Sequence, residues 1–335
     1  MKNPIVTALL AYGMSGKVFH APFLATHDGF ELKAVLERND KKAPLDYPEI
    51  ISYDSVTDLL ADESIELVVV NTPNFTHFEY AQKALLARKH VLIEKPAVTT
   101  VEEFKTLQAL AKEVNRKIFI YHNRRWSSDF MATKEVITSG ILGDIVEMHL
   151  RFDRFRPVIG PKFFKETPVP GSGIWFDLGS HLIDQAISIF GLPTQHYGYQ
   201  NNYRTNTQVP DFGFMHLQFS KTNVFITTSM LVADAQAGIV VHGTKGSFVK
   251  EFCDTQEAQL INGMLPTDTH FGIEPEGKEG KLTLIDENGS SVTRSIPSKK
   301  GNFNALFDCV FESIRLNKDY PISDEAVLKQ IELLG

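Results

Sequence analysis

Cysteine is scarce in this sequence, which contains only Cys253 and Cys309 among 335 residues and no Cys-x-x-Cys motif. A disulfide framework and a cysteine-bound zinc ion are therefore excluded. The eleven histidines show no metal-ligand spacing such as His-Glu-x-x-His. No metal site is predicted.

Long apolar runs and an excess of basic residues are also lacking. No apolar run approaches the ~20 residues that a membrane span needs. The 34 basic residues are outnumbered by 41 acidic ones, which gives a net charge of −7. Because non-specific nucleic-acid binding needs a basic face that displaces counterions, we expect neither a nucleic acid nor a membrane as a partner.

The N-terminus carries no recognisable targeting segment. The apolar run 5–11 is at the short limit for a signal peptide, and it leads into Gly13, Ser15 and Gly16 without a convincing cleavage site. A first strand that enters a turn explains it better, and the cytoplasm is the expected location. The length of the chain predicts about two domains.

Residues 1–121 alternate between short apolar runs and amphipathic segments. The runs are rich in Val, Ile and Leu and too short for helices, which is typical of strands buried on both faces of a parallel sheet. The expected strands are 6–11, 32–36, 67–70, 91–93 and 118–121. Helices are expected at 77–89 and at 100–114, the second starting with a Thr100–Glu103 capping box. This order predicts a doubly wound α/β domain that binds a dinucleotide.

Residues 122–335 have a different pattern, with more and longer strand-like runs. Helices are expected at 130–139, 173–190 and 304–316, and strands at 146–156, 212–219, 223–232, 238–242, 247–252 and 281–285. Asn288 and Gly289 are typical of a hairpin turn in which both central residues have positive φ. We predict that residues 122–335 form a second domain, a mostly antiparallel sheet with helices on one face.

A glycine turn follows the first expected strand. It consists of Gly13, Met14, Ser15 and Gly16, and glycines at this point let a backbone approach a pyrophosphate at a helix N-terminus. Glu37 ends the second expected strand about 20 residues after Gly16, where an acid can bind both ribose hydroxyls of NAD. Arg38 beside it would attract the 2′-phosphate of NADP. We expect NAD or NADP, with NAD slightly favoured by Glu37.

Further candidate residues follow later strands, at the edge where open α/β sheets bind ligands. We predict that the cofactor also contacts Thr72, Pro73, Asn74, His77, Glu94 and Lys95. Because a residue before proline rarely enters a helix, Lys95 is expected on an extended turn. Asp177 and His181 lie one turn apart on an expected helix, and histidine exchanges protons at neutral pH.

Together the glycine turn, Thr72-Pro73-Asn74, Glu94-Lys95-Pro96 and the pair Asp177 and His181 resemble the Gfo/Idh/MocA oxidoreductases over essentially the whole chain. Segments 13–22, 122–126 and 171–175 are most similar to the branch of NADP-preferring scyllo-inositol dehydrogenases. The resemblance implies that Lys95 polarises the reacting oxygen and that His181 is the acid or base. Asp177 would be its companion or a substrate ligand.

The resemblance also implies a hydride transfer between nicotinamide and a sugar, cyclitol or related polyol or carbonyl compound. Asn123, Arg124 and Trp175 would bind the substrate together with Asp177 and His181. The resemblance implies that residues 122–335 are a C-terminal α/β domain with a large open, mostly antiparallel sheet, which serves substrate binding and oligomerisation. The exposed face of this sheet would form a homodimer or homotetramer interface. Two alternatives stay open, a non-catalytic nucleotide-binding sensor on the same fold and an NAD-dependent glycosidase chemistry.

Overall fold

The computed structural model describes residues 3–335; residues 1–2, which open the first predicted domain, lie outside the described residues. The N-terminal part is a six-stranded parallel sheet in the order β3-β2-β1-β4-β5-β6. Its strands are β1 (Ile5–Leu9), β2 (Phe30–Leu36), β3 (Ile51–Tyr53), β4 (Leu67–Val70), β5 (His90–Ile93) and β6 (Ile118–Ile120). The predicted doubly wound sheet is confirmed, and the structure adds the short edge strand β3.

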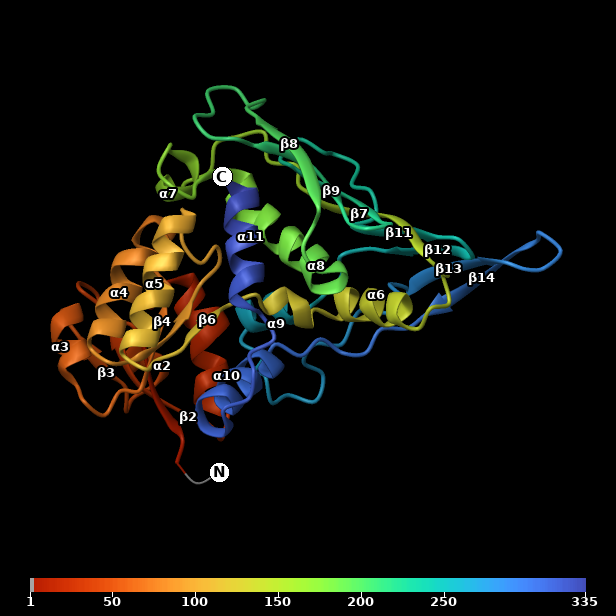
Figure 1. Cartoon of the computed structure of the whole chain (residues 1–335). Helices are drawn as coiled ribbons and strands as arrows, with labels where there is room; N and C mark the ends of the chain where they lie inside the picture. The colour runs from red at the N-terminus through yellow and green to blue at the C-terminus, as the bar shows by residue number, and fades with distance from the viewer. Residues whose placement is uncertain (1–2) are drawn as a thin grey trace.

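Helices cover both faces of this sheet (Figure 1). The N-terminal helices are α1 (Ala21–Thr26), α2 (Ala43–Asp46), α3 (Val56–Ala61), α4 (His77–Leu86) and α5 (Val101–Glu113). The predicted capping box is present, because the Thr100 hydroxyl accepts from the Glu103 amide and the Glu103 carboxylate accepts from the Thr100 amide. The apolar sides of α3, α4 and α5 share one core, while α1 packs on the opposite face.

The second sheet has eight strands in the order β14-β13-β12-β11-β7-β10-β9-β8. They are β7 (Ile145–Asp153), β8 (Gln195–Asn201), β9 (Phe212–Gln218), β10 (Asn223–Ser229), β11 (Ile239–Gly243), β12 (Gly246–Lys250), β13 (Gly280–Ile285) and β14 (Ser291–Ile296). All neighbours are antiparallel except β7 and β10, so the predicted mostly antiparallel sheet is confirmed. In this register Leu150 of β7 lies opposite Ile226 of β10 and Ile239 of β11.

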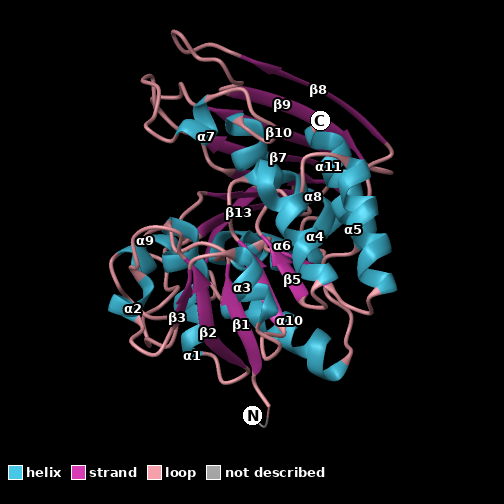
Figure 2. Cartoon of the chain, turned by 90° about the vertical axis from the view of Figure 1, so that its left-hand side faces the viewer, coloured by secondary structure: helices cyan, strands magenta, loops and turns pink. Residues whose placement is uncertain are grey.

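One face of the second sheet is buried under helices (Figure 2). The helices of this half are α6 (Ser128–Thr138), α7 (Phe163–Glu166), α8 (Ser180–Phe190), α9 (Gln256–Ile261), α10 (Asn304–Leu316) and α11 (Asp324–Leu334). The amphipathic helix α8 contributes Leu182, Ile183 and Ala186 to the core of this sheet. Short helical turns precede several of these elements: η1 (Ser15–His20), η2 (Asn74–Thr76), η3 (Asn123–Trp126) and η4 (Trp175–Gly179).

The two C-terminal helices join the halves of the molecule. Helix α10 packs Phe307 and Phe311 against Phe30, so it covers the same face of the first sheet as α1. Helix α11 gives Ile331 to the core of the first sheet and Leu334 to that of the second. Among residues 3–335, no helix is both long and apolar enough to cross a lipid bilayer.

Candidate functional site

The glycine turn follows β1, which lies beside β4 at the point where the strand order reverses. In open α/β sheets this switch point is where ligands bind. A Cβ on Gly16 would lie 2.1 Å from the Ala11 carbonyl oxygen, whereas one on Gly13 would meet nothing within 4 Å. The Asn71 side chain holds the turn, because its Oδ1 accepts from the Ala11 amide at 3.1 Å and its Nδ2 donates to the Ala11 carbonyl at 2.8 Å.

Glu94 ties the end of β5 to the same turn. Its carboxylate accepts hydrogen bonds from the Ser15 hydroxyl at 2.6 Å and from the Lys95 amide at 3.2 Å, and it lies 2.9 Å from His20 Nε2. Burial opposes ionisation, but the contacts of His20 and Ser15 and the charge of Lys95 outweigh it and lower the pKa of Glu94 to about 2. Glu94 is therefore an anion that fixes the geometry of the glycine turn.

The residues after β4 bridge the two halves. The Asn74 side chain donates to the Gly171 carbonyl of the second half at 2.7 Å, and Thr72 and Thr76 share a hydrogen bond of 2.7 Å. Pro73 precedes the short turn η2. His77 is fully buried, with its ring nitrogens 2.9 Å from the carbonyl oxygens of Thr72 and Pro96. The His77 ring thus connects the turn after β4, which contains Thr72, with the turn after β5, which contains Pro96.

Glu37 and Arg38 follow β2 but point to different surroundings. Glu37 is only 8% exposed. Its carboxylate accepts from the amides of Lys42 and Ala43 at 2.9 to 3.3 Å and from the Ser52 hydroxyl at 2.8 Å. These contacts occupy both carboxylate oxygens and argue against the expected hydrogen bonds from Glu37 to a ribose. Arg38 is exposed at the same strand end.

Lys95 reaches across to the second half and meets Asp177 of η4. Its amine donates to the Asp177 carbonyl at 2.6 Å and to Asp177 Oδ1 at 3.2 Å. Lys165 of α7 donates to the other oxygen, Oδ2, at 2.7 Å. One carboxylate is therefore shared by two lysines that come from different parts of the fold.

The charges in this cluster shift one another. Burial opposes the ionisation of Asp177, but Lys95 and Lys165 outweigh it and hold the pKa of its carboxyl well below its usual range. Burial lowers the pKa of the Lys95 amine; Asp177 opposes this shift and Lys165 adds to it. Asp177 is therefore an anion at neutral pH.

His181 lies in the first turn of the α8 helix, one turn beyond Asp177, and is 6% exposed. Its Nδ1 is buried and has no hydrogen-bond partner among the described residues. Burial, followed by the positive charge of Lys95 and Arg124, lowers the pKa of His181 well below its ordinary value. The ring is therefore neutral at neutral pH and able to accept a proton. Asp177 lies in a π-helical turn, and its carboxylate accepts hydrogen bonds from Lys95 and Lys165, not from the His181 ring.

The other predicted substrate residues, Asn123, Arg124 and Trp175, differ in their burial and contacts. Asn123 is buried in η3, and the neighbouring Arg124 donates to Glu257 at 3.0 Å while its guanidinium lies over the Phe152 ring. Trp175 is 1% exposed and its ring fills the space beside Gly179 and Gly213 in the second core, which favours a packing role. The substrate contact expected for Trp175 was implied only by the family resemblance.

Two residues of the site were missed from the sequence. Asn71 is the first residue after β4, and this position at a strand end could have indicated it. Lys165 had none, because it lies on a segment without a regular pattern and meets Asp177 only through the fold. Among residues 3–335, no three His, Cys, Asp or Glu side chains lie close enough together to hold a metal ion.

The glycine turn fits a bound dinucleotide. Open space lies over Gly13, and the close approach at Gly16 leaves no room for a side chain. The first helical turn, η1, begins within the glycine turn, at Ser15. Because the first amides of a helix lack intrahelical partners, they can bind the oxygens of a pyrophosphate. The sheet order and this turn define a dinucleotide-binding protein of the Rossmann class.

Comparison with known proteins identifies the family. The model described as "Oxidoreductase family, NAD-binding Rossmann fold" matches residues 7–122, and "Oxidoreductase family, C-terminal alpha/beta domain" matches residues 134–335. The chain therefore belongs to the Gfo/Idh/MocA family of oxidoreductases, which confirms the resemblance found in the sequence.

Curated relatives and a solved structure agree with this assignment. The uncharacterised oxidoreductase YdgJ of Escherichia coli is 34% identical over 100% of this chain and 95% of its own length. The scyllo-inositol 2-dehydrogenase (NADP(+)) IolW of Bacillus subtilis is 32% identical over 99% of this chain and 92% of its own. The structure of the oxidoreductase yvaA from B. subtilis superposes with a TM-score of 0.94 at 31% identity, over 99% of this chain and 94% of that one.

Proposed function

We propose that this protein is an NAD(P)-dependent dehydrogenase or reductase that acts on a CH–OH group of a sugar, cyclitol or related polyol, or on the corresponding carbonyl compound. The observation that carries the proposal is the contact of Lys95, at the cofactor edge of the first sheet, with Asp177, one turn before the neutral and buried His181. The same three residues were singled out in the sequence. The scyllo-inositol activity in the name of IolW supports the substrate class.

Each side chain has a distinct task in this proposal. In the oxidation direction, a ring nitrogen of His181 takes the proton of the substrate hydroxyl. The Lys95 ammonium donates a hydrogen bond to the same oxygen and stabilises the negative charge that develops there. A nicotinamide cofactor, held by the glycine turn and the residues that follow β4 and β5, would supply the acceptor for the hydride that leaves the substrate carbon as the hydroxyl becomes a carbonyl. In reduction His181 returns the proton.

We further propose that NADP is preferred to NAD. The carboxylate of Glu37 is turned inward to the amides of Lys42 and Ala43, so a ribose 2′-phosphate would not meet a free anion there. Arg38 is exposed beside it and can pair with the phosphate bidentately. This reverses the slight preference for NAD that the identity of Glu37 suggested, and the NADP(+) in the name of IolW agrees with it.

Titration of the purified protein with NADPH and with NADH, followed by nicotinamide fluorescence, tests the cofactor. NADPH is expected to bind more tightly, and Arg38→Ala should weaken NADPH by about 10-fold while leaving NADH unchanged. A panel of inositols, aldoses and their keto forms then tests the reaction. The catalytic assignment fails if Lys95→Ala or His181→Ala retains full turnover. Failure to bind either nucleotide would contradict the dehydrogenase function, whereas nucleotide binding without turnover of any compound in the panel would favour the nucleotide-binding sensor.

We also propose that the protein is a cytoplasmic homo-oligomer joined through the open face of the second sheet. That face carries aromatic side chains, including Tyr197 at 67% and Tyr199 at 48% exposure. His149 and His216 stack on Phe225 beside them, at 5.0 and 4.8 Å between ring centroids. Exposed aromatic patches of this kind mark interaction surfaces. Sedimentation of the wild type and of Tyr199→Glu tests it, since a dimer or tetramer should dissociate in the variant.

A further inference from the structure

A strap of residues 157–170 connects β7 to η4 and carries the short helix α7. Lys165 lies on this helix and places its amine 2.7 Å from Asp177 Oδ2. Lys95 holds the other oxygen of the same carboxylate at 3.2 Å. The strap thus brings a second lysine to the residue that faces Lys95.

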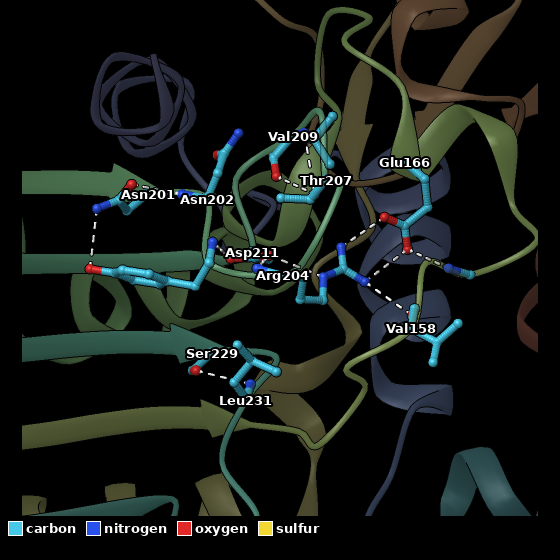
Figure 3. A network of polar contacts seen from close by, with 12 residues as sticks. Val158, Glu166, Asn201, Asn202, Arg204, Thr207, Val209, Asp211, Ser229 and Leu231 are labelled. Carbon is cyan, nitrogen blue, oxygen red and sulfur yellow. Dashed lines mark hydrogen bonds and ion pairs between the residues drawn. The ribbon is translucent and has the colours of Figure 1, made fainter.

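A buried ion-pair network holds the strap in place (Figure 3). Arg204, whose side chain is almost fully buried, donates to Glu166 Oε2 at 2.8 Å and to Asp211 Oδ2 at 3.1 Å. Its guanidinium also donates to the Val158 carbonyl at 3.4 Å, and the Gly160 amide donates to Glu166 at 3.0 Å. The residue next to Lys165 is therefore fixed from both sides.

The sharing of Asp177 has a consequence for Lys95. The Lys95 ammonium has three donors and directs two of them to Asp177. In the proposed reaction it also donates to a substrate oxygen on which negative charge develops, so its charge is shared between that oxygen and Asp177. A buried carboxylate with too little positive charge beside it is destabilised. Because Lys165 pairs with Oδ2, Asp177 keeps a full counter-ion while Lys95 donates to the substrate.

We propose that Lys165 is a positioning residue of the active site: it holds Asp177 as a paired anion and so leaves Lys95 free to serve the substrate. The Arg204–Glu166 ion pair holds the strap in the position that brings Lys165 to Asp177. This inference deepens the proposed dehydrogenase function and rests on it for the role of Lys95.

The first test measures the coupling of the two lysines without any substrate. The rate at which acetic anhydride labels Lys95 is followed against pH by peptide mass spectrometry in the wild type, Lys165→Met and Lys165→Arg. The charged or titratable groups around the Lys95 amine are Asp177, Lys165, Glu94, His122 and His181. Removing the charge of Lys165 should move the labelling midpoint to higher pH, and Lys165→Arg should restore it.

The second test uses turnover of the substrate that the polyol panel identifies. Lys165→Met should lower kcat by about 10- to 100-fold, the effect of one lost charge-assisted hydrogen bond. Lys165→Arg should recover most of it, and Glu166→Gln should lower kcat less, through a looser strap. Lys221→Met removes an exposed lysine from the turn between β9 and β10 and should leave kcat unchanged.

The outcomes separate the two proposals. An unchanged labelling midpoint in a folded Lys165→Met protein, or a kcat equal to that of the wild type, overturns the role of Lys165. A shifted midpoint supports the coupling even where no polyol is turned over, and that absence of turnover would count against the dehydrogenase function alone. Because the Lys165 side chain is 39% exposed, its replacement is expected to leave the fold intact.

Discussion

Replacing Gly16 by alanine tests the construction of the glycine turn. The new Cβ would lie 2.1 Å from the Ala11 carbonyl oxygen and 2.9 Å from Asn71 Nδ2. That oxygen is already held by the Asn71 amide, so the carbonyl cannot move without breaking a hydrogen bond of 2.8 Å. Overpacking of this kind costs about 1–3 kcal/mol, and the better helix propensity of alanine offsets up to about 1 kcal/mol.

We therefore expect Gly16→Ala to lower the free energy of unfolding by about 1–2 kcal/mol. Urea unfolding followed by circular dichroism measures this change. The same variant should bind NADPH more weakly, because the first turn of η1 is pushed out of position.

Gly13→Ala is the matched control. A Cβ at Gly13 meets nothing within 4 Å, so the stability of this variant should equal that of the wild type. Its nucleotide affinity should fall nevertheless, because the methyl group occupies the space that a pyrophosphate would approach. If Gly16→Ala unfolded at the wild-type urea concentration, or if Gly13→Ala bound NADPH as tightly as the wild type, the reasoning about this turn would be refuted.

Three further predictions concern packing, charge and pH. Trp175→Ala should cost about 3–5 kcal/mol of stability, measured by urea unfolding; a stable variant with altered substrate affinity would instead return Trp175 to the site. Arg125→Met should lower the free energy of unfolding by about 3–5 kcal/mol, because it leaves the buried Asp184 carboxylate without its cation. In the wild type this carboxylate accepts hydrogen bonds from Arg125 at 2.7 and 2.8 Å. An equally stable variant would contradict this. For oxidation, kcat/KM should stay constant as the pH falls to well below 6.5, because burial lowers the pKa of His181. On the alkaline side kcat/KM should fall before pH 10.5, because burial also lowers the pKa of Lys95. A loss of rate centred at pH 6.5 in a pH-rate profile would contradict a lowered pKa for the catalytic base.

The fold was predictable wherever burial leaves a pattern. The strands β1, β4 and β5 are apolar because both of their faces are covered, and this pattern is visible without neighbours. The edge strand β3 is three residues long, and every side chain of β8 is exposed, so neither carries a core pattern. The hairpin at Gly289 is present, with φ of +80° there, but Asn288 keeps a negative φ because Asp286 closes a longer loop.

Long-range packing was not predictable in the same way. Helix α10 was recognised as amphipathic, but its sequence does not say that the apolar side covers the first sheet, almost the whole chain away from β1. The same holds for the strap, whose position depends on the Arg204 network. A side chain that is brought to the site only by such contacts, as Lys165 is, leaves no signal in local spacing.

Glu37 lies at the position that the motif predicts, but its carboxylate has other partners than the motif suggests. An acid at the end of the second strand is the usual sign of a ribose contact, and its position here is as the sequence indicated. What decides its role is the loop that follows, because the amides of Lys42 and Ala43 turn back onto the carboxylate. The acid then organises the loop, and in our proposal the adjacent Arg38 is the group that meets the cofactor. On this proposal, specificity at this position depends on which partner satisfies the carboxylate, not on the presence of the carboxylate itself.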